Sequence, residues 1–182
     1  MKHTSLGTLL CPVARSLDHV GEWWSILILR DALTGLTRFD EFQQSLGIAT
    51  STLSVRLNAL VASGLLVKQQ YCEKPPRDEY ILTETGLDFE KVILAFTAWG
   101  NDHFAEEGHS TEIIDTQTQR PVRLGLVDLN TGEAITRERH TTAAGPAASE
   151  RMRYRFDYAA RRRADPDFAL TFAMPPRPAT EK

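Results

Sequence analysis

Cysteine is scarce in this chain of 182 residues, which contains two, Cys11 and Cys72. Two cysteines cannot build a disulfide framework, and without a CxxC pair the sequence offers no common zinc motif. Long apolar runs are missing too, so we expect neither a membrane span nor a secretory signal. These absences predict a cytoplasmic location, two free thiols, and no metal or other cofactor.

Catalytic signatures are also missing. The sequence shows no P-loop, no GxGxxG turn, no Ser-His-Asp order and no paired carboxylates at a catalytic spacing. Its five histidines lack the spacing of metal ligands, apart from the weak pair His103 and His109. We therefore expect that the protein is not an enzyme.

Positively charged residues are outnumbered, since the chain has 21 Lys+Arg and 24 Asp+Glu. Residues 1–108 hold 9 Lys+Arg against 14 Asp+Glu, a net charge of −5, and residues 109–182 hold 12 against 10, a net charge of +2. This balance argues against a surface coated in cations, but a local basic patch is enough for DNA binding. We predict a domain over residues 1–108 and a C-terminal extension over 109–182.

Apolar spacing predicts two helices near the start of the chain. Pro12 suits the first turn of a helix that continues to about Val20. A second helix, from about Trp23 to Leu33, reads WWSILILRDAL and is apolar on all sides. We expect it to lie in the core, with Trp23 and Trp24 contributing much of the buried area.

Residues 38–63 predict two short amphipathic helices joined by a tight turn. The first covers residues 38–46, and Gly47 begins the turn. Thr50 or Ser51 is suited to cap the second helix, which runs to Ser63. Its apolar face is formed by Leu53, Leu57, Leu60 and Val61.

A hairpin follows these helices. Residues 65–71 and 78–82 read as paired strands, and the tip between them, EKPPR, holds Lys74 and Arg77 outward. Helix, turn, helix and hairpin is the order of a winged helix-turn-helix. The predicted fold class is therefore mainly α with a β-wing (α+β).

A long helix is predicted after the wing, with Thr83 or Thr85 as its cap and an end near residue 107. So small a domain cannot cover its whole apolar surface, and a second copy of the chain is the economical cover. We therefore predict a homodimer, with an interface that includes Phe89, Val92, Ile93, Phe96 and Trp99.

The extension has a different composition. A β-hairpin is predicted over residues 122–135, around Leu-Asn-Thr-Gly. A linker over about 141–149, an Arg-rich segment over 151–163 and a disordered end over 174–182 follow. No internal repeat is evident.

These residues resemble the HxlR family of bacterial winged helix-turn-helix regulators, relatives of the MarR-type regulators. The resemblance covers about residues 10–107 and rests on Cys11-Pro12, ILILRDAL, RFDEF, GIATSTLSVRL, SGLL, the PPR wing and LTETG, in this order. It implies a homodimer that binds pseudo-palindromic, double-stranded operator DNA. In several members of the family the cysteine before the first proline responds to electrophiles or oxidants, and here that position is Cys11.

The predicted DNA-binding residues come from the second helix of the motif, its flanks and the wing. Asn58 can pair bidentately with adenine, whereas the apolar Val55 can contact a thymine methyl group. Arg56 either binds a phosphate or pairs with a neighbouring acid such as Asp40 or Glu41. The full predicted set is Arg38, Thr50, Ser51, Thr52, Val55, Arg56, Asn58, Lys74 and Arg77.

Cys11 has two readings. As a sensor it needs an accessible thiol with a lowered pKa, which the nearby helix N-terminus and Arg15 would help to provide. As a structural residue it is a small apolar side chain at the dimer interface. Cys72 is expected to be an ordinary strand residue.

The sequence thus predicts a dimeric DNA-binding transcriptional regulator, a repressor released by an electrophile, an oxidant or another small-molecule effector. The alternative is a winged helix that serves as a protein-interaction module without specific DNA binding. The extension is compatible with a ligand-binding module, because the predicted hairpin could form a pocket against the long helix.

Overall fold

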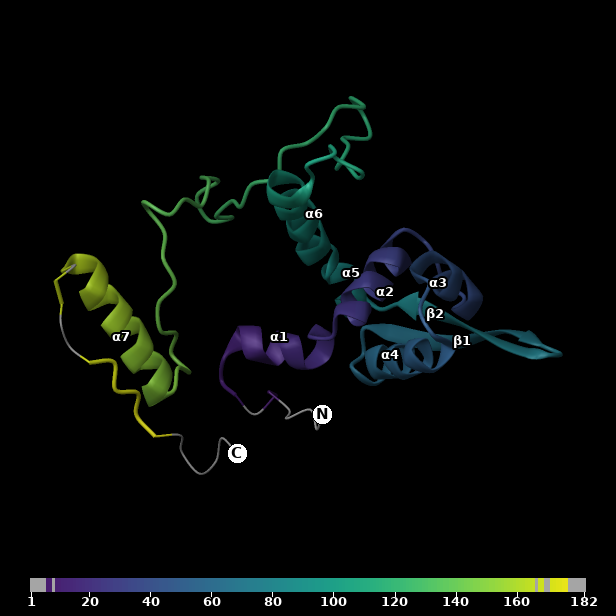
Figure 1. The fold of residues 1–182 in the computed structure, drawn as a ribbon, viewed down its shortest axis with the longest axis horizontal. Helices are drawn as coiled ribbons and strands as arrows, with labels where there is room; N and C mark the ends of the chain where they lie inside the picture. The colour runs from purple at the N-terminus through teal and green to yellow at the C-terminus, as the bar shows by residue number, and fades with distance from the viewer. Residues whose placement is uncertain (1–5, 8, 166, 169–170, 177–182) are drawn as a thin grey trace. The chain divides into compact units, whose positions relative to one another are not determined.

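The computed structural model describes residues 6–7, 9–165, 167–168 and 171–176 (Figure 1). By its internal contacts the chain divides into two compact units. One covers His19–Leu126, and the other combines Met1–Asp18 with Val127–Lys182. The predicted domains 1–108 and 109–182 are defined by sequence rather than by contacts and stay a prediction.

The unit over residues 19–126 is built around three helices. These are α2 (Trp23–Leu33), α3 (Phe39–Leu46) and α4 (Thr50–Ala62), which pack at the base of a two-stranded sheet (Figure 1). The fully buried side chains are Phe42, Ile28, Leu29, Leu53, Leu57, Leu60 and Leu66. These side chains lie on α2, α3, α4 and the first strand of the sheet. The predicted winged helix-turn-helix fold is therefore confirmed.

The turn between α3 and α4 is set by two backbone features. Gly47 ends α3 in the left-handed region, at φ 61° and ψ 22°, where a glycine carries no Cβ penalty. Ala49 then takes the extended N-cap conformation of α4. The predicted cap at Thr50 or Ser51 is wrong, because Thr50 is already helical and its hydroxyl oxygen accepts a hydrogen bond from Gln43 Nε2 at 2.9 Å.

The wing consists of β1 (Leu66–Glu73) and β2 (Pro76–Leu82) in antiparallel register. Its base joins the core, since Tyr80 is buried and its N–H donates to the carbonyl oxygen of Thr37 at 2.7 Å. The tip projects away from the helices (Figure 1). The wing can therefore reach a partner while its base stays anchored.

The predicted long helix is divided into α5 (Glu84–Asp88) and α6 (Glu90–Phe104), which meet at Phe89. Thr83 caps α5, as predicted, by accepting a hydrogen bond from the N–H of Gly86. A Cβ at Gly86 would collide with the carbonyl oxygen of Leu65. This position therefore requires glycine.

Trp23 departs from the sequence prediction. Its side chain is 73% exposed, whereas Trp24 packs partly against the core. The inward face of α2 is set by Ser25, Ile28, Leu29 and Ala32, and a residue two positions before Ser25 points to the opposite side of a helix. The expectation that Trp23 fills the core is wrong.

Between residues 109 and 149 the chain has turns in place of regular strands. The predicted hairpin over 122–135 reduces to one antiparallel bridge between Val127 and Ala134. No third strand and no apolar layer covers this bridge within the described residues, and an isolated two-stranded hairpin is marginal in water. The predicted linker over 141–149 contains no helix or strand.

Two of these turns repeat each other, which the sequence reading missed. In each, an aspartate Oδ1 accepts the backbone N–H two residues ahead, and the fifth residue has a positive φ. The threonine three residues ahead donates its N–H to the carboxylate in the first turn and its hydroxyl in the second. The first spans Asp115 to Gln119, and the second spans Asp128 to Gly132. The shared signal is the spaced pattern Asp-x-Gln/Asn-Thr, a form of Asx turn.

Two further helices belong to the other unit in whole or in part. α1 (Pro12–Val20) has its first seven residues there, and α7 (Glu150–Ala164) follows the hydroxyl cap of Ser149. The Arg-rich segment is thus helical. The disordered end predicted over residues 174–182 lies mostly outside the described residues. None of the described helices combines the length and the apolar character needed to cross a membrane.

Candidate functional site

The outward face of α4 is the centre of the candidate DNA interface. Leu53, Leu57 and Leu60 anchor the helix in the core, so the positions between them must face outward. Val55 is 59% exposed. Thr50, Ser51 and Asn58 are exposed as well, and Thr52 is half-buried.

The same helix lacks acidic residues, since its sequence is TSTLSVRLNALVA. Its N-cap residue Ala49 has no side-chain oxygen to bond the first helical N–H groups. Such groups at a helix N-terminus attract phosphate. This face can therefore approach a polyanion without carboxylate repulsion from its own helix, even though the surrounding region is acidic.

Arg56 is engaged elsewhere in the structure. Its Nη2 lies 3.1 Å from Glu22 Oε2, and its side chain is largely buried. The predicted partners Asp40 and Glu41 are wrong for this arginine. The physical reason is that Glu41 folds back onto its own helix start, where its Oε2 accepts the N–H groups of Thr37 and Arg38. The hydrogen bond from Arg38 N–H, followed by that from Thr37, lowers the pKa of Glu41.

Arg38 and Arg77 converge on an aromatic ring that the sequence reading did not select. The Cζ atom of Arg38 lies 4.6 Å from the ring centroid of Tyr71. A hydrogen bond with the side chain of Tyr71 raises the pKa of Arg77. Tyr71 thus groups the N-cap residue of α3, Arg38, with a cation from the wing. The sequence signal that could have indicated this role is an aromatic residue on a wing strand, Tyr71, with Lys68 and Lys74 three positions to either side.

The wing tip carries a mixed charge. Lys74 and Arg77 are exposed, but Lys68 on β1 is paired with Asp78 at 2.8 Å. That hydrogen bond raises the pKa of Lys68. The cations left for DNA on the wing are therefore those of the tip and the Tyr71 cluster.

Helix α6 carries the predicted dimer face. It has no buried residue, and Phe96 and Trp99 are 49% and 54% exposed. Val92 is exposed and Ile93 half-buried, while Phe89 packs against the core of its own unit. Trp99 also contacts Phe104 edge-to-face at 4.9 Å. A row of aromatic residues this open to solvent is typical of an interaction surface.

Cys11 lies in the other unit, just before α1, and is half-buried. Its pKa is lowered, first by hydrogen bonding from the N–H of Ala14 and then, against the opposing effect of burial, by Val13 and Arg155. The expectation that Arg15 assists the thiol is wrong, because Arg15 Nε donates to the carbonyl oxygen of Leu9 at 2.8 Å. The assisting cation is Arg155 of α7, which the sequence could not place.

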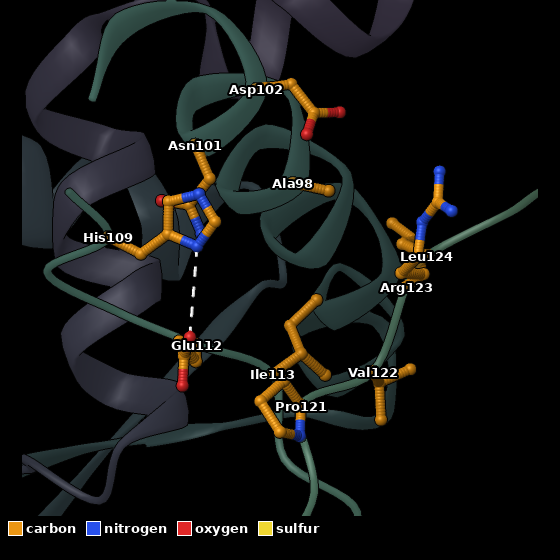
Figure 2. Close-up of a pocket in the computed structure, with 10 residues that line it drawn as sticks. All are labelled: Ala98, Asn101, Asp102, His109, Glu112, Ile113, Pro121, Val122, Arg123 and Leu124. Carbon is orange, nitrogen blue, oxygen red and sulfur yellow. Dashed lines mark ion pairs between the residues drawn. The ribbon is translucent and has the colours of Figure 1, made fainter. Parts of the chain in front are cut away.

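A separate cavity of about 220 Å³ lies at the end of α6 (Figure 2). His109 Nδ1 faces Glu112 Oε1 at 3.9 Å, and Asn101 Nδ2 donates to the carbonyl oxygen of Thr111 at 2.8 Å. This cavity lies between α6 and residues 109–124, whereas the hairpin predicted to form a pocket against the long helix is reduced to a single bridge. Among the described residues, no group of three or more His, Cys, Asp or Glu side chains is placed to hold a metal ion.

Comparisons with known proteins fit this geometry. The profile of a family described as HxlR-like helix-turn-helix matches residues 19–108. Rv3095, an uncharacterised HTH-type transcriptional regulator of Mycobacterium tuberculosis, is 36% identical over 141 residues, which are 77% of this chain and 89% of the relative.

Solved structures are similar as well. The candidate transcription factor PA1374 of Pseudomonas aeruginosa is 54% identical, with a TM-score of 0.59 over 80% of this chain and 99% of that chain. The redox regulator HypR in its reduced form is 31% identical, with a TM-score of 0.50 over 52% of this chain and 95% of that chain.

Proposed function

Because the chain belongs to the HxlR-like helix-turn-helix family and is a transcriptional regulator with a helix-turn-helix domain, we propose that it is a repressor that binds pseudo-palindromic operator DNA as a homodimer. The observation that carries this proposal is the acid-free outward face of α4, with Asn58 and Val55 exposed on it. Asn58 would read a base edge, and Val55 would contact a thymine methyl group. Thr50, Ser51 and Thr52 would bind phosphates or base edges near the helix start.

The cations would hold the domain on the backbone of the DNA. Arg38 and Arg77, grouped by Tyr71, and Lys74 at the wing tip are suited to phosphates. Arg56 would have to leave Glu22 to reach DNA, so we assign it to the fold of the domain. With so few cations in each copy, affinity depends on two copies set about one helical turn of DNA apart, or a multiple of it.

A titration by fluorescence anisotropy tests the DNA proposal, with the chain's own upstream region against random DNA. The variant Asn58→Ala is expected to lose about 1–3 kcal/mol of discrimination between the two. Lys74→Gln is expected to weaken both complexes alike and to reduce the salt slope by about 1. Lys91→Gln is the control, because this side chain on α6 is 68% exposed and lies outside the predicted DNA-binding set.

Equal affinity of the purified dimer for both DNAs at moderate salt would contradict specific regulation. It would favour the alternative, a winged helix that acts as a protein-interaction module. The comparison therefore separates the two functions directly.

The dimer itself can be tested in solution. Phe96→Asp is expected to convert the dimer to a monomer, because an aspartate cannot be desolvated against an apolar partner. Leu129→Asp is the matched control, since Leu129 is 95% exposed. The measurement is light scattering after gel filtration, and a dimer that survives Phe96→Asp would remove α6 from the interface.

For the sensor role, the support is the lowered pKa of Cys11 and the similarity to the redox regulator HypR. Oxidation or alkylation of Cys11 would release the operator if the modified state binds DNA less tightly. Iodoacetamide, which transfers its carboxamidomethyl group to one thiolate and releases iodide, is expected to release DNA from wild type and Cys72→Ser but not from Cys11→Ser. An equal response of Cys11→Ser would remove Cys11 from the mechanism.

A further inference from the structure

In the unit formed by residues 1–18 and 127–182, a cavity lies between the chain around Cys11 and helix α7. Its volume is about 840 Å³, which is within the range of small-molecule sites. Met152, Phe156 and Ala159 of α7 form one wall, and Leu10, Pro12 and Val13 line the other side. The lining is therefore predominantly apolar.

Charge on the lining has a single sign. Arg155 and Arg163 contribute to the wall, and no aspartate or glutamate lines the cavity. The positions 155, 159 and 163 recur every four residues, so their side chains share one face of α7. The small Ala159 between the two arginines leaves room there. Arg155 is packed over the ring of Phe156, with its Cζ atom 5.2 Å from the ring centroid, which holds the guanidinium beside the apolar wall.

An apolar volume with two arginines and no acid matches a ligand that has an apolar body and one anionic group. We propose that this cavity binds a small amphipathic anion of the monocarboxylate class, with its carboxylate paired to Arg155 and Arg163. Cys11 borders the same cavity, so a bound ligand covers its thiol. A regulatory role for the ligand rests on the proposed function, whereas the binding itself does not.

Calorimetric titration of the full chain with decanoate tests the proposal. 1-Decanol and decyltrimethylammonium serve as neutral and cationic probes of the same length. Decanoate is expected to bind about tenfold more tightly than either, the scale of a charge-assisted hydrogen bond. Equal binding of decanol, or no measurable binding of decanoate, would overturn the proposal.

Two arginine variants and one control locate the site. Arg155→Gln and Arg163→Gln are each expected to weaken decanoate binding by about tenfold, while Arg162→Gln on the same helix leaves it unchanged. Ala159→Phe is expected to abolish binding by filling the cavity, with circular dichroism showing that α7 is retained. Equal losses in all three arginine variants would show attraction to general charge and would contradict the site.

The thiol gives a second readout. Decanoate is expected to slow alkylation of Cys11 by iodoacetamide, and Cys11→Ser is expected to bind decanoate as tightly as wild type. Unchanged alkylation at saturating decanoate would place the ligand elsewhere. Because none of these measurements includes DNA, failure of operator binding and failure of the ligand site are distinguished.

Discussion

Two regions of this chain are held together in different ways. Residues 19–126 contain the buried apolar core, from Val20 to Tyr80. Among the described residues of 1–18 and 127–182, no side chain is buried to that degree. The second region relies on contacts between aromatic rings, such as Tyr158 and Phe172, whose centroids lie 4.8 Å apart. It also relies on hydrogen bonds within surface turns, such as that from Asn130 N–H to Asp128 Oδ1. Hydrogen bonds that compete with water stabilise a fold only modestly.

This difference agrees with the tasks proposed above for the two regions. A DNA-reading helix must be held at a defined position, which a close-packed core provides. A ligand-binding or sensing region benefits from a lower cost of rearrangement. Substitutions in the two regions should therefore differ in how much they change the free energy of unfolding and in which property they change.

Core truncation in the first region should have the largest effect. Leu57→Ala removes a fully buried side chain of α4 and is expected to cost about 2–5 kcal/mol of the free energy of unfolding. Urea denaturation measures this loss. Leu129→Ala, at an exposed position of the second region, is expected to cost less than about 0.5 kcal/mol, and a comparable cost there would break the contrast between the regions.

A smaller effect is expected where α5 meets Leu65, the residue before β1. Gly86→Ala places a Cβ against the carbonyl oxygen of Leu65 and should cost about 1–3 kcal/mol through overpacking. Gly100→Ala in α6 is the matched control, since a Cβ there meets no atom within 4 Å. It is expected to gain about 0.4–1 kcal/mol by restricting the unfolded chain.

The ring contacts of the second region can be weakened without touching the core. Tyr154→Ala removes a ring 5.5 Å from that of Phe172 and an oxygen that accepts the N–H of Ala173. Amide hydrogen exchange in α7 should become faster. The free energy of unfolding of residues 19–126, measured by urea denaturation, should change by less than about 0.5 kcal/mol. A matching loss in the core would show that the regions unfold together.

The smallest expected effect concerns the pH dependence of Cys11. Its lowered pKa keeps a larger thiolate fraction near neutrality, so alkylation in a Cys72→Ser background should persist to lower pH than for an unfolded thiol. Arg155→Gln should raise the midpoint slightly, because the hydrogen bond from Ala14 N–H, the larger cause, remains. An unchanged midpoint would remove Arg155 from the environment of the thiol.

The sequence predicted those parts of the site that depend on local order. The spacing of Leu53, Leu57 and Leu60 sets which face of α4 is buried, and therefore which face carries Val55 and Asn58. The same periodicity failed for Trp23, because a helix apolar on all sides does not reveal which side meets the core.

By itself, then, the sequence determined the winged helix-turn-helix and the face of α4 that stays exposed, since hydrophobic periodicity and turn residues act within a few positions of one another. The tertiary structure alone decided the pairing of Arg56 with Glu22, the grouping of Arg38 and Arg77 on Tyr71, and the place of Arg155 beside Cys11. These contacts join segments far apart in the chain. Their geometry follows from how the helices and strands pack, which no local pattern records.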